Sequence, residues 1–162
     1  MPITKEKKKE IVSSLKKSIE NAKSVVFVNF HGLTVLDARN LRRALKSENV
    51  GYTVSRKTLI NRVLDAETIS GTKPEFKGEL ALAYGEDLIA PARGVYEFQK
   101  KLDGKVSILG GIFEGRYMGM KEMTDIASIP SLQTLRGMFV NILNSPIQRF
   151  AIALNEVAKA KN

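Results

Sequence analysis

The chain has 162 residues, enough for one domain or for one domain with an appendage, and a formal net charge of +9. It has no cysteine, which excludes disulfide bonds and cysteine-ligated zinc sites and fits a reducing cytoplasm. No segment reaches the roughly 18 continuous apolar residues of a membrane span, and the lysine-rich N-terminus lacks the apolar core of a secretory signal.

Helices and strands are expected to alternate along the first 130 residues. Helices are predicted over 4–22, 34–47, 56–64, 87–102 and 120–129. Apolar spacing indicates the first, and Asp87 and Pro91 mark the start of the fourth. Runs of β-branched and aromatic residues predict strands over 24–30, 51–55, 79–84 and, as one or two strands, 105–118. The polar segment 65–78, which contains glycines and a proline, is expected to be a loop.

This order of elements indicates the fold class. After the first helix, the pattern strand–helix–strand occurs twice, which predicts an α+β plait of the ferredoxin-like type. We expect one open sheet with the helices on one face. Thr34 and Asp37 have the spacing of a capping box, and the helix that they open is expected to bury three leucines. These are Leu36, Leu41 and Leu45.

The positive charge is concentrated in the first part of the chain. Residues 1–62 contain 14 Lys and Arg against 5 Asp and Glu, whereas residues 63–162 contain 12 of each. A solvated surface is one explanation. Such an uneven distribution more often marks a polyanionic partner, which could be RNA, DNA or an anionic membrane.

No constellation of residues indicates catalysis. His31 is the only histidine, and without cysteine it has no thiol partner for nucleophilic chemistry. The glycine-rich segment 110–115 lacks the Gly-Lys-Ser/Thr ending of a phosphate-binding loop. We therefore expect no enzyme, no metal and no cofactor.

The signals for RNA binding are stronger. Arg39, Arg42, Arg43 and Lys46 follow one another at steps that place them on one helix face, opposite its leucines. Arginine grips phosphate in a bidentate manner, while hydroxyl and amide groups bind phosphates and riboses. Because aromatic residues are few in this region, shape recognition of folded RNA is favoured over single-strand stacking. The residues expected to bind RNA are Lys7, Lys8, His31, Gly32, Arg39, Arg42, Arg43, Lys46, Ser55, Arg56, Lys57, Thr58, Asn61 and Arg62.

The C-terminal segment carries a separate signal. Between Ser131 and Ala158 only three of 28 residues are charged, against 27% in the whole chain. Two apolar stripes differ in phase by one residue and meet at Pro146, which predicts two helical segments or one helix kinked there. Apolar residues on the supposed outer face indicate a protein partner that covers them. The residues expected to bind it are Phe139, Ile142, Leu143, Ile147, Phe150, Ala151, Ile152, Leu154, Val157 and Ala158.

The chain resembles a known family over nearly its whole length. The segments 31–46, 52–64, 78–93 and 129–150 are similar, in this order, to motifs of the bacterial large-subunit ribosomal protein ten family. His31 stands where that family usually has arginine, Lys57 replaces asparagine, and Glu79-Leu80 replaces Pro-Thr.

The resemblance implies a division of labour. Residues 1–130 would form a domain that binds large-subunit rRNA at the stalk base, beside ribosomal protein eleven. Residues 131–162 would form a protruding, kinked helical tail that carries two dimers of the acidic stalk protein, which recruit translational GTPases. The resemblance also implies binding to the chain's own mRNA leader, no membrane, and a cytoplasmic location on the ribosome.

An alternative from the residues themselves is a free RNA-binding regulator whose apolar tail self-associates. A third class, a phosphate-handling enzyme, lacks any motif.

Overall fold

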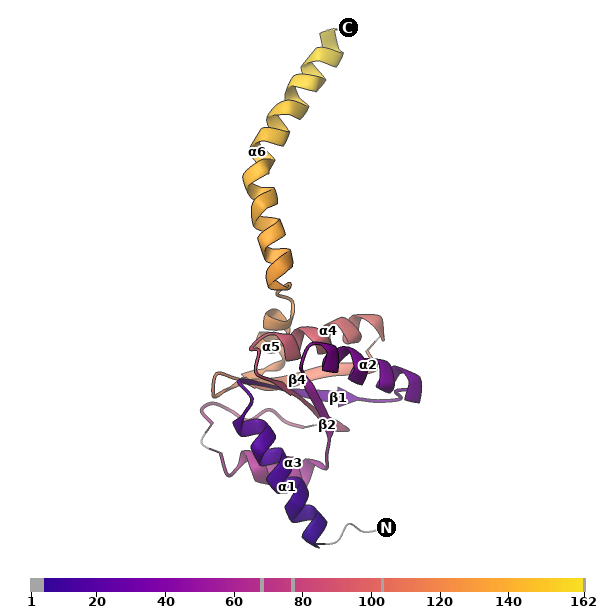
Figure 1. Ribbon diagram of the computed structural model, residues 1–162, viewed down its shortest axis with the longest axis vertical. Coiled ribbons are helices and arrows are strands. Elements are labelled where there is room, and N and C mark those ends of the chain that lie inside the picture. Colours follow the sequence, from indigo (N-terminus) through magenta and orange to yellow (C-terminus); the bar gives the residue numbers. More distant parts are fainter. Residues whose placement is uncertain (1–4, 68, 77, 103, 162) are drawn as a thin grey trace. The chain divides into compact units, whose positions relative to one another are not determined.

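The computed structural model describes residues 5–67, 69–76, 78–102 and 104–161 of the chain (Figure 1). The chain divides into two compact units, Met1–Ile129 and Pro130–Asn162.

The first unit is built on one antiparallel sheet of five strands in the order β2-β3-β1-β4-β5. The strands are β1 (Ser24–Phe30), β2 (Gly51–Val54), β3 (Leu80–Gly85), β4 (Val106–Phe113) and β5 (Arg116–Gly119). The first four have the strand order of a ferredoxin-like plait, with β5 added beside β4 as a hairpin. The predicted α+β fold class is confirmed.

Helices cover both faces of this sheet (Figure 1). They are α1 (Lys5–Glu20), α2 (Val35–Ser47), α3 (Lys57–Leu64), α4 (Ala90–Lys101) and α5 (Met120–Ala127). Residues of α2, α4 and α5 pack with Val26 and Val28 of β1 in one core cluster. Residues of α1 and α3 pack with Val25 and Phe27 in a second cluster.

The expectation that the helices lie on one face was therefore wrong. Consecutive residues of a strand point to opposite faces, so the unbroken apolar run of β1 buries side chains on both. All four residues from Val25 to Val28 are at most 1% exposed, and each face needs its own cover.

The start of α2 follows its sequence pattern, with one exception. The Thr34 hydroxyl caps the helix by accepting from the Asp37 amide at 3.2 Å, as the capping box predicts. Leu41 and Leu45 are buried, but Leu36 is 71% exposed, so its predicted burial was wrong. At about 100° per residue, Leu36 lies about 140° around the helix from Leu41 and faces solvent.

The second unit is one helix, α6 (Leu132–Lys161), with Pro146 inside it. The helix is continuous and bends partway along its length (Figure 1), so the prediction of one kinked helix, rather than two segments, is confirmed. Within the described residues, no helix combines the length and the hydropathy that crossing a bilayer requires.

Candidate nucleic-acid interface

Chain direction brings the two predicted RNA-binding segments to one end of the sheet. β1 and β2 both pair antiparallel to β3, so they run in the same direction, and α2 runs back between them. The last residues of β1 and β2 therefore lie near the starts of α2 and α3. We call this region, residues 30–36 and 54–58, the cationic end.

Local contacts fix the turn that follows β1. The His31 amide donates to the Lys105 carbonyl at 2.9 Å, which holds the turn against the start of β4. Gly32 has a φ of 61°, a left-handed conformation that glycine adopts without strain. The exposed His31 side chain is thus held beside the N-terminus of α2.

The start of α3 is open to an anion. Its N-cap, Arg56, makes no side-chain capping hydrogen bond, so the first amides of α3 lack a side-chain acceptor. Helix N-termini carry partial positive charge and favour phosphate, and Arg56 and Lys57 add two full charges. This end therefore suits phosphate groups.

A hollow of about 510 Å³ opens at the cationic end. We call it the Phe30 hollow. It is lined by Phe30, Val54, Ser55, Arg56, Lys57, Gly78, Glu79 and Leu80. Its walls thus combine apolar groups with two cations and one carboxylate, drawn from three separate parts of the chain.

The solvent face of α2 extends the positive charge along the molecule. Arg39, Arg42, Arg43 and Lys46 are all exposed. None of the four forms an ion pair with another residue in the described part of the chain. They are therefore available to phosphates.

Arg42 links this face to the sheet edge. Its guanidinium carbon lies 6.0 Å from the centre of the Tyr52 ring of β2. Burial raises the pKa of the Tyr52 phenol, and the Arg42 charge opposes that rise. The phenol is therefore neutral at physiological pH, and the guanidinium keeps its full charge for an external anion.

The basic residues do not lie on a single face. α2 and α3 cover opposite faces of the sheet, and the edge strand β2 lies between them in sequence. Predicted contacts of α2 (Arg39, Arg42, Arg43) and at the start of α3 (Arg56, Lys57) therefore belong to helices on opposite faces, which both begin at the cationic end.

The remaining predicted contacts differ in position. Thr58 and Arg62 are exposed on α3, while the Asn61 side-chain oxygen is enclosed and has no hydrogen-bond partner among the described residues. Lys7 and Lys8 are exposed on α1, which packs with α3. The sequence reading missed Val35, Leu36, Val54 and Glu79. Val35, Leu36 and Val54 are apolar residues close in sequence to the cations, whereas no local pattern in the sequence indicates Glu79.

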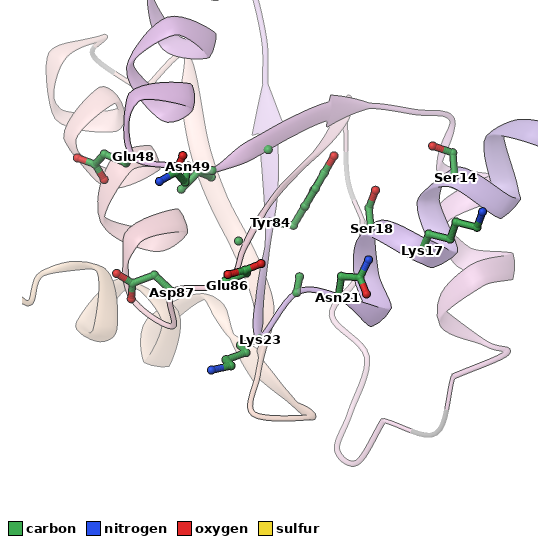
Figure 2. A pocket seen from close by; sticks show the side chains of 14 residues that line it. Ser14, Lys17, Ser18, Asn21, Lys23, Glu48, Asn49, Tyr84, Glu86 and Asp87 are labelled. Carbon is green, nitrogen blue, oxygen red and sulfur yellow. The ribbon is translucent and has the colours of Figure 1, made fainter.

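The opposite end of the sheet has a different character. A hollow of about 870 Å³ lies there, between the end of α1, the turn from α2 to β2, and the end of β3 (Figure 2). Its lining includes three acidic residues, Glu48, Glu86 and Asp87, as well as Lys17 and Lys23. The C-terminal ends of α1 and α2 add partial negative charge. This end is less suited to a polyanion than the cationic end.

The second candidate surface is α6. All ten residues predicted to bind a partner lie on this helix and are exposed. Phe139 is 63% exposed, Ile147 69% and Phe150 67%. Exposed apolar residues this numerous are expected to be covered by another protein.

The fold and these two surfaces define a class of protein. It combines a basic α+β unit, of the kind suited to RNA, with a helix whose exposed apolar residues are suited to a protein partner.

Comparison with known proteins identifies the family. The model of the family described as Ribosomal protein L10 matches residues 3–100. The large ribosomal subunit protein uL10 of Lactobacillus johnsonii is 33% identical over 159 residues, covering 96% of this chain and 95% of the relative. The uL10 proteins of Shouchella clausii and Bacillus licheniformis are 32% and 31% identical over 157 residues, each covering 96% of this chain and 94% of the relative.

The chain therefore belongs to the ribosomal protein L10 family, as its motifs predicted. It is a structural constituent of the large ribosomal subunit in the cytoplasm, and it is not an enzyme.

Proposed function

We propose that the first unit attaches the chain to large-subunit rRNA at the stalk base, through the cationic end and the outer face of α2. The observation that supports this most directly is the set of unpaired cations on α2 and at the start of α3. Ribosomal protein eleven would be a neighbour on the ribosome, and the same surface would serve the chain's own mRNA leader.

We propose that α6 carries two dimers of the acidic stalk protein, through which the chain supports recruitment of translational GTPases. The exposed apolar residues that begin at Phe139 and continue beyond Pro146 to Val157 make the helix long enough for two sites. The partner would bury apolar side chains that are each worth roughly 1.5–3 kcal/mol when removed from water.

The salt dependence of binding tests the RNA assignment. Each phosphate neutralised contributes about 0.7–0.9 to the slope of log K against log salt. Replacing Arg42, Arg43, Arg56 and Lys57 with alanine should therefore reduce the slope for a stalk-base rRNA fragment by about 3 and weaken binding. As a matched control, Lys100, Lys101, Arg116 and Lys121 lie outside this surface, and replacing them removes the same charge. Equal effects of the two sets would contradict the assignment.

Truncation and native mass spectrometry test the tail. We expect the co-expressed full chain to carry four copies of the acidic stalk protein, a chain ending at Ala153 to carry two, and a chain ending at Asn144 to carry none. Retention of four copies by both truncated chains would place the site elsewhere. A monodisperse homodimer of the lone chain would favour the self-associating regulator instead.

A further inference from the structure

The Phe30 hollow has a composition that plain phosphate binding does not require. Its lining includes Phe30, Val54 and Leu80 beside Arg56 and Lys57. Phosphate groups need only the cations, whereas an unstacked RNA base is held by apolar or aromatic contact together with hydrogen bonds to its edge. We infer that this hollow binds one unpaired guanine of the RNA, read by the carboxylate of Glu79. The inference rests on the RNA binding proposed above.

The size and charge of the hollow suit a nucleotide. At about 510 Å³ it falls within the range of roughly 300–1,000 Å³ common for small-ligand sites. Val54 is 45% exposed although it is apolar, so a base placed against it would remove apolar surface from water. Arg56 and Lys57 stand on the same rim, where they would contact the flanking phosphates.

Exposed apolar residues gather in the same part of the first unit. Four large apolar residues are exposed among its described residues: Val35, Leu36, Val54 and Met120. Three of them lie between residues 29 and 62, where the predicted RNA contacts are concentrated. This surface therefore has contact area for bases and riboses as well as charge for phosphates.

Glu79 determines which base fits. A carboxylate on a surface that binds phosphate repels the ligand, unless it accepts hydrogen bonds from it. Glu79 is exposed and forms no ion pair or hydrogen bond within the described residues, so both of its oxygens can accept. Guanine is the base whose Watson–Crick edge presents two adjacent donors, the N1 imino and N2 amino groups. Adenine, cytosine and uracil each offer one donor group.

The test uses the full chain at nanomolar concentration and five RNA hairpins of one stem. The hairpins differ in a single bulged nucleotide: guanosine, inosine, adenosine, cytidine or uridine. We expect guanosine to bind more tightly than adenosine by roughly five- to a hundredfold, the range for one bidentate contact. Inosine, which lacks only the 2-amino group, should fall between them.

Two matched variants assign the preference to Glu79. Glu79→Gln should reduce the ratio of guanosine to adenosine affinity to within about twofold, because the amide replaces one acceptor with a donor. Glu86→Gln removes the same charge at the opposite end of the sheet and should leave the ratio unchanged. Equal affinity of the unmodified chain for all five hairpins, or an unchanged ratio in Glu79→Gln, would overturn the inference.

The rRNA fragment, measured in the same assay, separates the two proposals. If the fragment binds with a steep salt dependence but the hairpins show no preference for guanosine, the base site is overturned and the proposed RNA binding stands. Absence of binding to both the fragment and the hairpins would overturn the proposed function, and the base site with it.

Discussion

Gly111 offers the sharpest test of how the sheet is packed. It lies in β4 opposite Val26 of the central strand β1. A Cβ added there would lie 2.6 Å from the Val25 carbonyl oxygen and would also overlap the end of the Met123 side chain. Val25 and Met123 are both at most 1% exposed, so neither can move into solvent.

The expected cost of Gly111→Ala follows from these contacts. Inserting one carbon into a well-packed core typically costs 1–3 kcal/mol. Alanine in place of glycine within a strand recovers roughly 0.5–1 kcal/mol of backbone entropy. The net loss should be about 1 kcal/mol, within a range of about 0–2.5 kcal/mol. The melting temperature should fall by about 3–5 °C for each kcal/mol lost in a unit of this size.

Denaturant unfolding followed by far-ultraviolet circular dichroism measures this loss. In a Met123→Ala background, Gly111→Ala should still lower the stability, because the clash with the backbone oxygen remains. Greater stability of Gly111→Ala than of the natural chain would refute the proposed packing of β4 against β1. At temperatures well below the transition, the RNA affinity should be unchanged, since Gly111 lies outside the cationic end.

Four further results are expected. The Cβ of Gly94→Ala would lie 2.6 Å from Leu45 Cδ2, so this substitution should destabilise the natural chain. In a Leu45→Ala variant the clash is absent, and the same substitution should stabilise the chain by roughly 1 kcal/mol of helix propensity. Denaturant titration of both backgrounds measures whether the effect on the free energy of unfolding changes sign. Thr34→Ala should cost about 1 kcal/mol by removing the cap of α2, while Thr34→Ser should retain most of it; thermal unfolding compares them. A chain ending at Ser131 should be monodisperse by light scattering at concentrations where the full chain alone associates. Raising salt from about 0.1 to 0.5 M should release rRNA but leave the partner on α6, because salt screens charge and does not weaken apolar burial; co-sedimentation measures both.

Much of the fold could be predicted because local signals agreed. The Thr34 cap, the leucine spacing of α2 and the β-branched run of β1 each determine local structure over a few residues. The packing of helices on both faces of the sheet was not predicted. The unbroken apolar run of residues 25–28 indicates it, because consecutive strand residues point to opposite faces. Leu36 was placed in the core because it is a leucine, although its position around the helix is opposite that of Leu41.

The site could be predicted only in part. The cations of α2 and α3 are visible in the sequence, but the directions of β1 and β2 decide that their segments meet at one end of the sheet. The Phe30 hollow joins residues near positions 30, 54–57 and 78–80, and no local pattern connects these positions. Glu79 became a candidate only because the fold places it in the lining of the same hollow as Arg56.

The two proposed binding surfaces depend on opposite properties of the chain, which is a reason for them to occupy separate units. A surface that binds RNA needs unpaired cations exposed to solvent, and burying them against a protein partner would be costly. A surface that binds protein through apolar contact gains from excluding charge, and α6 has only three charged residues between Ser131 and Ala158. If the arginines of α2 were interspersed among the apolar residues of α6, a protein partner would bury arginines without giving them an anion to pair with. RNA would in turn lie against apolar side chains that it cannot remove fully from water. Their separation would allow both proposed partners to be bound at once.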